Sequence, residues 1–333
     1  MNNRPIDKIR NSGLQMTLPP DTGGITDMGE INGVFYSIGG SAIYRVQLAD
    51  EIDPQRTNIA IPNTHQKVLS YGTGHLFVRQ TLMTARRLFN NKVLDSAFDC
   101  KTGINLSFEA LQDMAAMYDV MKELRDKLGK ISEDVKNLAV EQRSMNIPSI
   151  GDVRGQTKAF LRKADHVTIA LFNIAKLFYG DAIGSRWFES LHSLINKKYG
   201  ETDQFTKFLK ETLPFLQFVR NARNAMEHTD KTKSVKVADI SLLPSGELNP
   251  PSIEVIHPET PQPSVSLLAL MEQIADQLAI VFEIMLAHLC GVNVRPFAGM
   301  PLVVVEYDEN QQKAFKCRYG YAGQMENRLV PFG

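Results

Sequence analysis

The stretch LAIVFEIMLAHLC, residues 278–290, is apolar on almost every side of the helix that it predicts. A helix without a polar face must be covered by other elements, so this one belongs near the centre of a helical bundle. The run is too short, and too interrupted by polar residues, to span a bilayer. It therefore indicates a bundle built around a buried helix, predicted over residues 264–290, and no membrane.

Three further helical stretches precede this central helix. They are predicted over residues 153–179, 182–198 and 203–228. Pro214 is expected to kink or split the last of them. Residues 231–263 carry short strand candidates punctuated by prolines. The prediction is a helical-bundle domain over residues 152–291 with a β insertion at about 231–263.

The regions outside the bundle have different patterns. Residues 1–74 read as extended, and GVFYSIGGSAIYRV (33–46) predicts a hairpin with a Gly-Gly turn. Residues 75–146 form a predicted helical arm, and residues 292–333 a β segment with a hairpin. The predicted fold class is therefore mainly α: a helical bundle with β-hairpin elaborations at the N-terminus, before the last helix and at the C-terminus.

The helical arm has two open readings. Ser107 is its candidate N-cap, and apolar residues recur at spacings of three and four from Leu111 to Leu138. This pattern is typical of a coiled-coil-like seam, with Gly129 as a candidate break. The arm packs either on the protein's own core or on a partner, and the pattern is compatible with both.

Charge and cysteine content narrow the function classes. Lys plus Arg and Asp plus Glu both number 37, so a site for a polyanion has to be a local patch. The three cysteines lie far apart and the N-terminal sequence MNNRPIDKIR is polar. Neither a disulfide framework nor a secretory signal is therefore expected. These features predict a cytoplasmic protein.

Several common enzyme motifs are absent from the sequence. It contains no GxxxxGK[ST] loop, dinucleotide fingerprint, HExxH, zinc-spaced Cys/His cluster or GxSxG elbow. ATPase, dehydrogenase, zinc-hydrolase and esterase activities are therefore disfavoured. No cofactor and no metal ion is predicted.

The most informative polar cluster is VRNARNAMEH, residues 219–228, at the end of a predicted helix. At about 100° per residue, five polar side chains share one sector opposite an apolar side: Arg220, Arg223, Asn224, Glu227 and His228. A solvated helix face explains this arrangement. A phosphate site explains it too, because arginine binds phosphate oxygens through its planar fork and histidine exchanges a proton near neutral pH. In that reading Glu227, one turn from Arg223, fixes the guanidinium.

The string RNAMEH, from Arg223 to His228, resembles the R-x(4–6)-H motif of HEPN domains, the helical family named for higher eukaryotes and prokaryotes nucleotide-binding proteins. A polar residue, often asparagine, follows the arginine in that family, and Asn224 matches this position. The resemblance covers roughly residues 153–290 and implies a HEPN-like helical bundle. It does not cover either end of the chain.

The resemblance implies a metal-independent endoribonuclease that acts on RNA as a homodimer, in the manner of a toxin or phage-defence effector. An antitoxin or another regulatory protein is a candidate partner. Two copies of the motif would face each other across a composite cleft. His228 would act as general acid or base for attack of the ribose 2′-hydroxyl on phosphorus. Arg223 would stabilise the phosphorane charge, and Asn224 would orient the substrate or the histidine. Arg220 is added from the helix geometry as a phosphate contact.

Members of this family also often carry an acidic or polar residue on an earlier helix that holds the motif arginine. Asp165 and Asn173 are the candidates for this role, and Glu283, an acid in an apolar helix, is another. A carboxylate buried there needs a cationic partner or has a raised pKa. In the alternative interpretation, each of these three residues is an ordinary helix-surface residue or makes a hydrogen bond within the bundle.

Alternatives to this interpretation stay open. A second string, RWFESLH (186–192), also satisfies the motif spacing, but Trp187 stands where a polar residue is expected, so Arg223 and His228 are preferred. The chain is alternatively a non-catalytic HEPN-type module that binds nucleotide or assembles with a protein partner. In a third reading it is a structural protein in which the motif is accidental.

Overall fold

The structure is a computed structural model that describes residues 4–12, 22–135, 146–184, 186–325 and 328–332. About 52% of it is helical and 21% is strand, in four separate sheets. The fold is mixed α/β, so the predicted mainly α class with small hairpins is wrong. The chain divides into two compact units, one formed by residues 1–108 and 294–333 and the other by residues 109–293. The N-terminal extended region and the C-terminal β segment therefore belong to the same unit.

A four-stranded antiparallel sheet forms the N-terminal part of the first unit, with the strands in the order β1-β2-β3-β4. The strands are β1 (Ile25–Ile31), β2 (Val34–Gly39), β3 (Ile43–Gln47) and β4 (Thr64–Leu69), with short helices α1 (Pro5–Asn11) and α2 (Ala49–Ile52) in the same segment. Ile38 pairs with Ile43 across the predicted hairpin. Both isoleucines are fully buried, so one face of this sheet belongs to a core.

A second sheet in the first unit comes from the C-terminal segment. Its strands are β10 (Leu302–Glu306), β11 (Tyr319–Met325) and β12 (Arg328–Phe332), with helix α10 (Glu309–Phe315) between the first two. After β4, the chain forms α3 (Leu76–Val78), the π-helical turn η2 (Arg79–Met83) and α4 (Thr84–Leu88), which also belong to the first unit. The Tyr321 hydroxyl donates to the Leu88 carbonyl oxygen (2.7 Å) and Arg87 donates to the Tyr307 hydroxyl (2.7 Å). These bonds hold the C-terminal sheet on α4.

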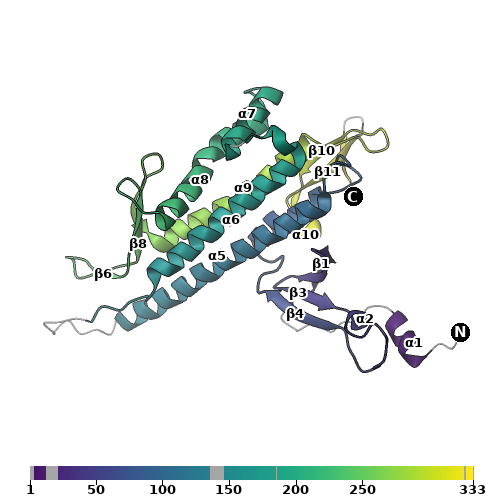
Figure 1. Ribbon diagram of the computed structural model, residues 1–333, viewed down its shortest axis with the longest axis horizontal. Coiled ribbons are helices and arrows are strands. Elements are labelled where there is room, and N and C mark those ends of the chain that lie inside the picture. Colours follow the sequence, from purple (N-terminus) through teal and green to yellow (C-terminus); the bar gives the residue numbers. More distant parts are fainter. Residues whose placement is uncertain (1–3, 13–21, 136–145, 185, 326–327, 333) are drawn as a thin grey trace. The chain divides into compact units, whose positions relative to one another are not determined.

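Long helices dominate the second unit (Figure 1). They are α5 (Cys100–Val135), which begins in the first unit, α6 (Val153–Tyr179), α7 (Trp187–Tyr199), α8 (Gln204–Glu227) and α9 (Leu267–Gly291), with the 3-10 turn η3 (Gly180–Ala182) after α6. Helices α6, α8 and α9 lie beside one another. Most residues in the second half of α9 are buried, among them Leu278, Phe282 and Met285, while Ile280 is exposed. The stretch at 278–290 is thus at the core of this unit, as its composition predicts.

Helix α5 differs from the predicted arm in its start and in its surroundings. It begins at Cys100, and Ser107 lies inside it with its hydroxyl donating to the Gly103 carbonyl. Gly129 does not interrupt it. The Tyr118 hydroxyl donates to Asp276 on α9 (2.8 Å). The helix therefore packs on the protein's own bundle, and the predicted continuation to about residue 145 lies outside the described residues.

A β segment connects α8 to α9 and corresponds to the predicted insertion. It contains a three-stranded sheet of β5 (Ser234–Ala238), β8 (Ser252–Ile256) and β9 (Gln262–Ser266), and a two-stranded sheet of β6 (Ser241–Leu242) and β7 (Leu248–Asn249). Each insertion or end region therefore forms a sheet of paired strands rather than one hairpin. Strands such as β4 and β9 have no clear alternation of apolar residues, and pairing with neighbours defines them. This explains why the strand content exceeds the prediction.

Helix α9 as a whole has the length and mean hydropathy (1.5) of a membrane-spanning helix, because it is longer than its most apolar run. Within the described structure, 61% of its most apolar window is buried. A mostly buried apolar helix of this kind is compatible with the core of a soluble protein.

We expect His288 on α9 to make the stability of the second unit sensitive to acid. Its ring stacks on Phe205 of α8 with centroids 5.1 Å apart, and burial lowers its pKa below the ordinary 6.5. A lowered pKa means that the unfolded chain binds the proton more readily. The contribution of neutral His288 to stability is therefore fully present above pH 6.5. It is lost as the pH falls through the lower pKa of the folded state. We expect His288→Phe to lose less stability than the wild type between neutral pH and about pH 5.5, as measured by urea unfolding. Identical losses in the two proteins would contradict this role.

Candidate functional site

Helix α8 carries the motif in its last turns. The Asp203 carboxylate caps its start by accepting hydrogen bonds from the backbone of Phe205 (2.9 Å) and Thr206 (3.3 Å). The helix stays continuous through Pro214, so the predicted split does not occur, and the alternative, a kink, stays a prediction. It ends at Glu227, and the His228 amide still donates to the Asn224 carbonyl oxygen (2.8 Å). The motif therefore stands where α8 passes into the following loop.

Arg223 is bound to Asp165 of α6. Its Nε and Nη2 atoms both donate to the same carboxylate oxygen of Asp165, at 2.8 and 2.5 Å. The Asp165 side chain is 2% exposed and the Arg223 side chain 28% exposed. A buried carboxylate thus holds the guanidinium in a fixed orientation while part of it remains open to solvent, which is the arrangement needed to receive an anion.

His228 is exposed at the C-cap of α8. Its backbone has left the helical region (φ −127°, ψ 66°), so the rotation of 100° per residue does not place its side chain. Among the described residues, its imidazole takes part in no hydrogen bond or ion pair. Asn224, in the last turn, is half-buried. The imidazole is therefore exposed at the end of the same helix that carries the partly exposed Arg223.

Glu227 binds α6 cations rather than the motif arginine. One carboxylate oxygen lies 3.0 Å from Lys158 Nζ, and the other lies 3.9 Å from Arg162 Nε. The hydrogen bond from Lys158 lowers the pKa of Glu227, and the charges of Arg162 and Arg223 lower it further. Glu227 is therefore an ion-pair partner of α6 and only a neighbouring charge to Arg223.

The other predicted site residues lie in different surroundings. The Arg220 guanidinium lies 4.8 Å from the ring centre of Trp187, and the arginine is exposed. Glu283 is buried on α9 at 2% exposure, and Asn173 is half-buried on α6. Of the three candidates for holding the motif arginine, the structure brings Asp165 to it.

The second string with the motif spacing has no comparable geometry. Arg186 precedes α7 as its N-cap residue, whereas His192 lies within that helix. The Arg186 backbone amide donates to the Ser190 hydroxyl (2.9 Å), which is a local capping contact. The two residues therefore do not form a pair at a helix end, and His192 provides a matched control for His228.

Sequence reasoning missed the contribution of Lys158, and it considered Arg162 as part of an RNA path without connecting it to Glu227. They stand four residues apart on α6, and Asp165 follows within the next turn, so all three share one face of that helix. That spacing is visible in the sequence. The packing of this face of α6 against the end of α8 is a tertiary contact that the sequence pattern does not reveal.

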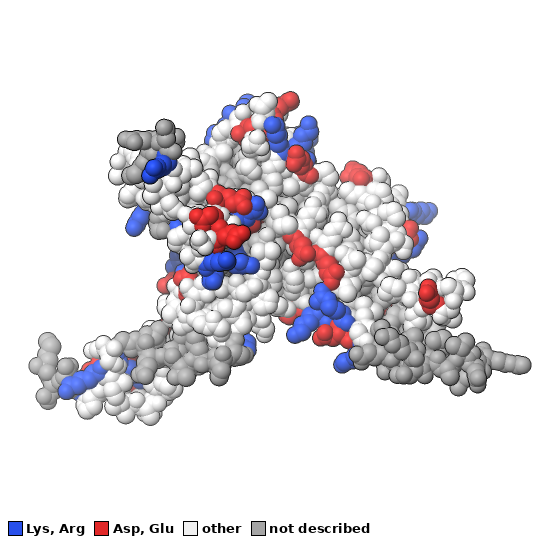
Figure 2. All heavy atoms as spheres, turned by 180° about the vertical axis from the view of Figure 1, so that it is seen from behind, with Lys and Arg blue, Asp and Glu red and all other residues white. Residues whose placement is uncertain are grey.

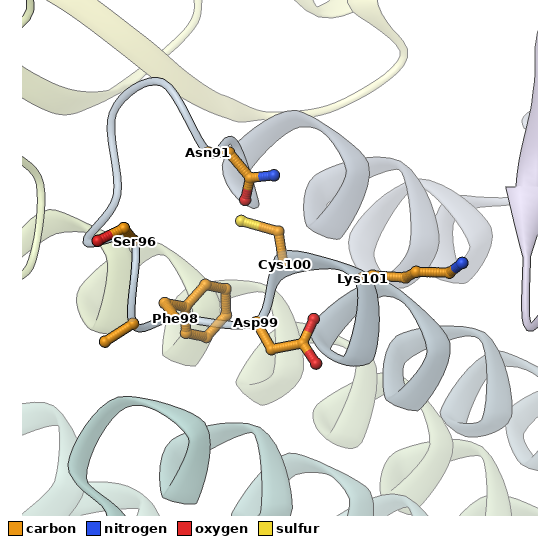
Figure 3. Close-up of a pocket in the computed structure, with 7 residues that line it drawn as sticks. Asn91, Ser96, Phe98, Asp99, Cys100 and Lys101 are labelled. Atoms are coloured by element: carbon orange, nitrogen blue, oxygen red, sulfur yellow. The ribbon is translucent and has the colours of Figure 1, made fainter.

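A pocket of about 450 Å³ lies in the first unit (Figure 3), whereas the motif residues belong to the second. Its lining includes Asn91, Phe98, Asp99, Cys100 and Lys101. Burial raises the pKa of the Cys100 thiol to about 11, so the sulfur is protonated and a poor nucleophile at neutral pH. Among the described residues, no group of three or more His, Cys, Asp or Glu side chains is placed to hold a metal ion.

Comparison with models of protein families, with curated proteins and with solved structures finds no match. The resemblance to HEPN domains therefore rests on the residues of this chain alone.

Proposed function

We propose that this chain is a cytoplasmic, metal-independent endoribonuclease of HEPN type, a toxin-like or phage-defence-like effector that works as a homodimer. The observation that supports the proposal best is the arrangement at the end of α8. Arg223 is held by buried Asp165, and His228 is exposed at the C-cap that follows. A fixed cation and an exposed imidazole at the end of one helix suit in-line chemistry on a phosphodiester.

The proposed reaction is transesterification within the RNA strand. One imidazole takes the proton of a ribose 2′-hydroxyl, and the 2′-oxygen forms a bond to the adjacent phosphorus. The bond from phosphorus to the 5′-oxygen breaks, and a protonated imidazole gives its proton to that oxygen. The products are a 2′,3′-cyclic phosphate and a 5′-hydroxyl. Two copies of His228, one from each protomer, fill the base and acid roles, while Arg223 neutralises the charge on the phosphorane oxygens.

The reaction predicts a strict need for the 2′-hydroxyl and none for a divalent cation. We expect the purified protein to cut single-stranded RNA in excess EDTA and to leave a 2′,3′-cyclic phosphate end. DNA of the same sequence should stay intact, because it lacks the attacking group. Cleavage that requires added magnesium, or equal cleavage of the DNA, would overturn the mechanism. Binding of RNA without cleavage would favour the non-catalytic HEPN-type module.

A further inference from the structure

A second cationic cluster lies beside the motif, formed by Lys158 and Arg162 of α6 around Glu227 of α8. Lys158 Nζ and Arg162 Nε lie 3.0 and 3.9 Å from the two carboxylate oxygens of Glu227. The charge of Arg223 acts on the same carboxylate. The cluster and the Arg223–Asp165 pair are therefore neighbours at the same helix–helix contact.

The cations of this cluster are more open to solvent than the carboxylate between them. The side chains of Lys158 and Arg162 are 49% and 62% exposed, whereas that of Glu227 is 17% exposed. Long basic side chains with exposed ends can turn towards an incoming anion. An exposed ion pair contributes little to stability, so a phosphate of a polyanionic strand can compete with it.

The hydrogen bonding of the Glu227 carboxylate is incomplete. Its Oε1 atom is screened from solvent and accepts no hydrogen bond from the described part of the chain. Within the described residues, the ion pairs at this contact join three cations, Lys158, Arg162 and Arg223, to two carboxylates, Asp165 and Glu227. The net charge of these five side chains is therefore positive, although the whole chain has no net charge. On the face seen in Figure 2, basic and acidic side chains are interspersed, so a local excess of this kind can distinguish one place from the rest.

We propose that Lys158 and Arg162 form a second phosphate subsite for an RNA strand, next to the phosphate bound by Arg223, and that Glu227 occupies this subsite in the free protein. When RNA binds, a phosphodiester takes the place of the carboxylate between the two cations. The assignment of RNA as the ligand rests on the proposed function. The subsite itself is measurable by binding, without any cleavage.

The subsite predicts that neutralising Lys158 and Arg162 weakens RNA binding and its salt dependence together. In a His228→Ala background, which slows cleavage, a fluorescein-labelled single-stranded RNA of about 12 nucleotides is titrated by anisotropy. We expect Lys158→Gln/Arg162→Gln to bind at least about tenfold more weakly near 0.1 M salt, and the slope of log K against log salt to shrink by about 0.7 because one phosphate contact is lost.

Glu227→Gln provides the opposite test, because it removes the competing charge and keeps the shape. We expect this variant to bind the same RNA several-fold more tightly, with its thermal unfolding temperature little changed. Weaker or unchanged binding would contradict the competitor role of Glu227.

Lys207→Gln/Lys210→Gln is the matched control, since it makes the same charge change on exposed residues in the N-terminal half of α8. These lysines precede Arg223 by more than three helical turns. We expect near wild-type binding. Equal weakening by both double variants would show a diffuse charge effect and overturn the subsite. If the wild type does not cleave RNA but Lys158→Gln/Arg162→Gln still binds it selectively more weakly, the nuclease proposal fails and the subsite stands.

Discussion

Replacing His228 by alanine is expected to slow RNA cleavage in EDTA by about 10²- to 10⁴-fold, which is the usual contribution of general acid–base catalysis. The side chain is exposed and at the C-cap of α8, so its removal leaves no cavity. We therefore expect the thermal unfolding temperature and the affinity for RNA to change little. The measurement is the single-turnover rate of cleavage with enzyme in excess.

His192→Ala is the control for this variant. It removes a histidine from the second string with the motif spacing, on α7 of the same unit. Its cleavage rate should equal that of the wild type. If the two histidine variants cleave RNA at the same rate, His228 is not the acid–base group, and the nuclease proposal loses its main support.

Arg223→Ala is expected to destabilise the protein by about 3 kcal/mol, because it leaves the buried Asp165 carboxylate without its cation. Asp165→Asn should cost only about 1 kcal/mol, since the partly exposed guanidinium of Arg223 can still reach water and the amide oxygen can still accept. Urea unfolding followed by circular dichroism measures both values.

The double variant Arg223→Ala/Asp165→Asn tests whether the two residues act as a pair. Once the carboxylate is replaced by an amide, loss of the arginine no longer leaves a buried charge without an ion-pair partner. The double variant should therefore be more stable than Arg223→Ala alone. An Asp165→Asn variant less stable than Arg223→Ala, or simple additivity of the two changes, would show that the buried carboxylate is not what Arg223 stabilises.

The long helices were predictable because their signals are local. Helix α6 matches the predicted range 153–179, and α8 and α9 differ from prediction by only a few residues at their ends. Apolar residues recur along them with the period of a helix, and Asp152 and Asp203 are side-chain N-caps. The sheets were underestimated because a strand such as β9, QPSVS, is defined by pairing with β8 rather than by its own pattern.

The candidate site was predictable in part. Asp165 was a candidate partner of the arginine, but nothing in the sequence distinguished it from Asn173 or Glu283. The contact depends on which face of α6 packs on α8. The expected contact between Glu227 and Arg223 assumed that neighbours along one helix bind each other. In the structure Glu227 reaches the cations of α6 instead, because those cations are presented to it by tertiary packing.

The proline within α8 leaves a gap in the backbone hydrogen bonds of that helix. Proline has no amide hydrogen, so nothing at position 214 can donate to the Lys210 carbonyl oxygen. The turns that carry the motif lie after this gap, and side-chain contacts join them to α6: Arg223 with Asp165, and Glu227 with Lys158. The position of the motif therefore depends on these contacts as well as on the helix backbone.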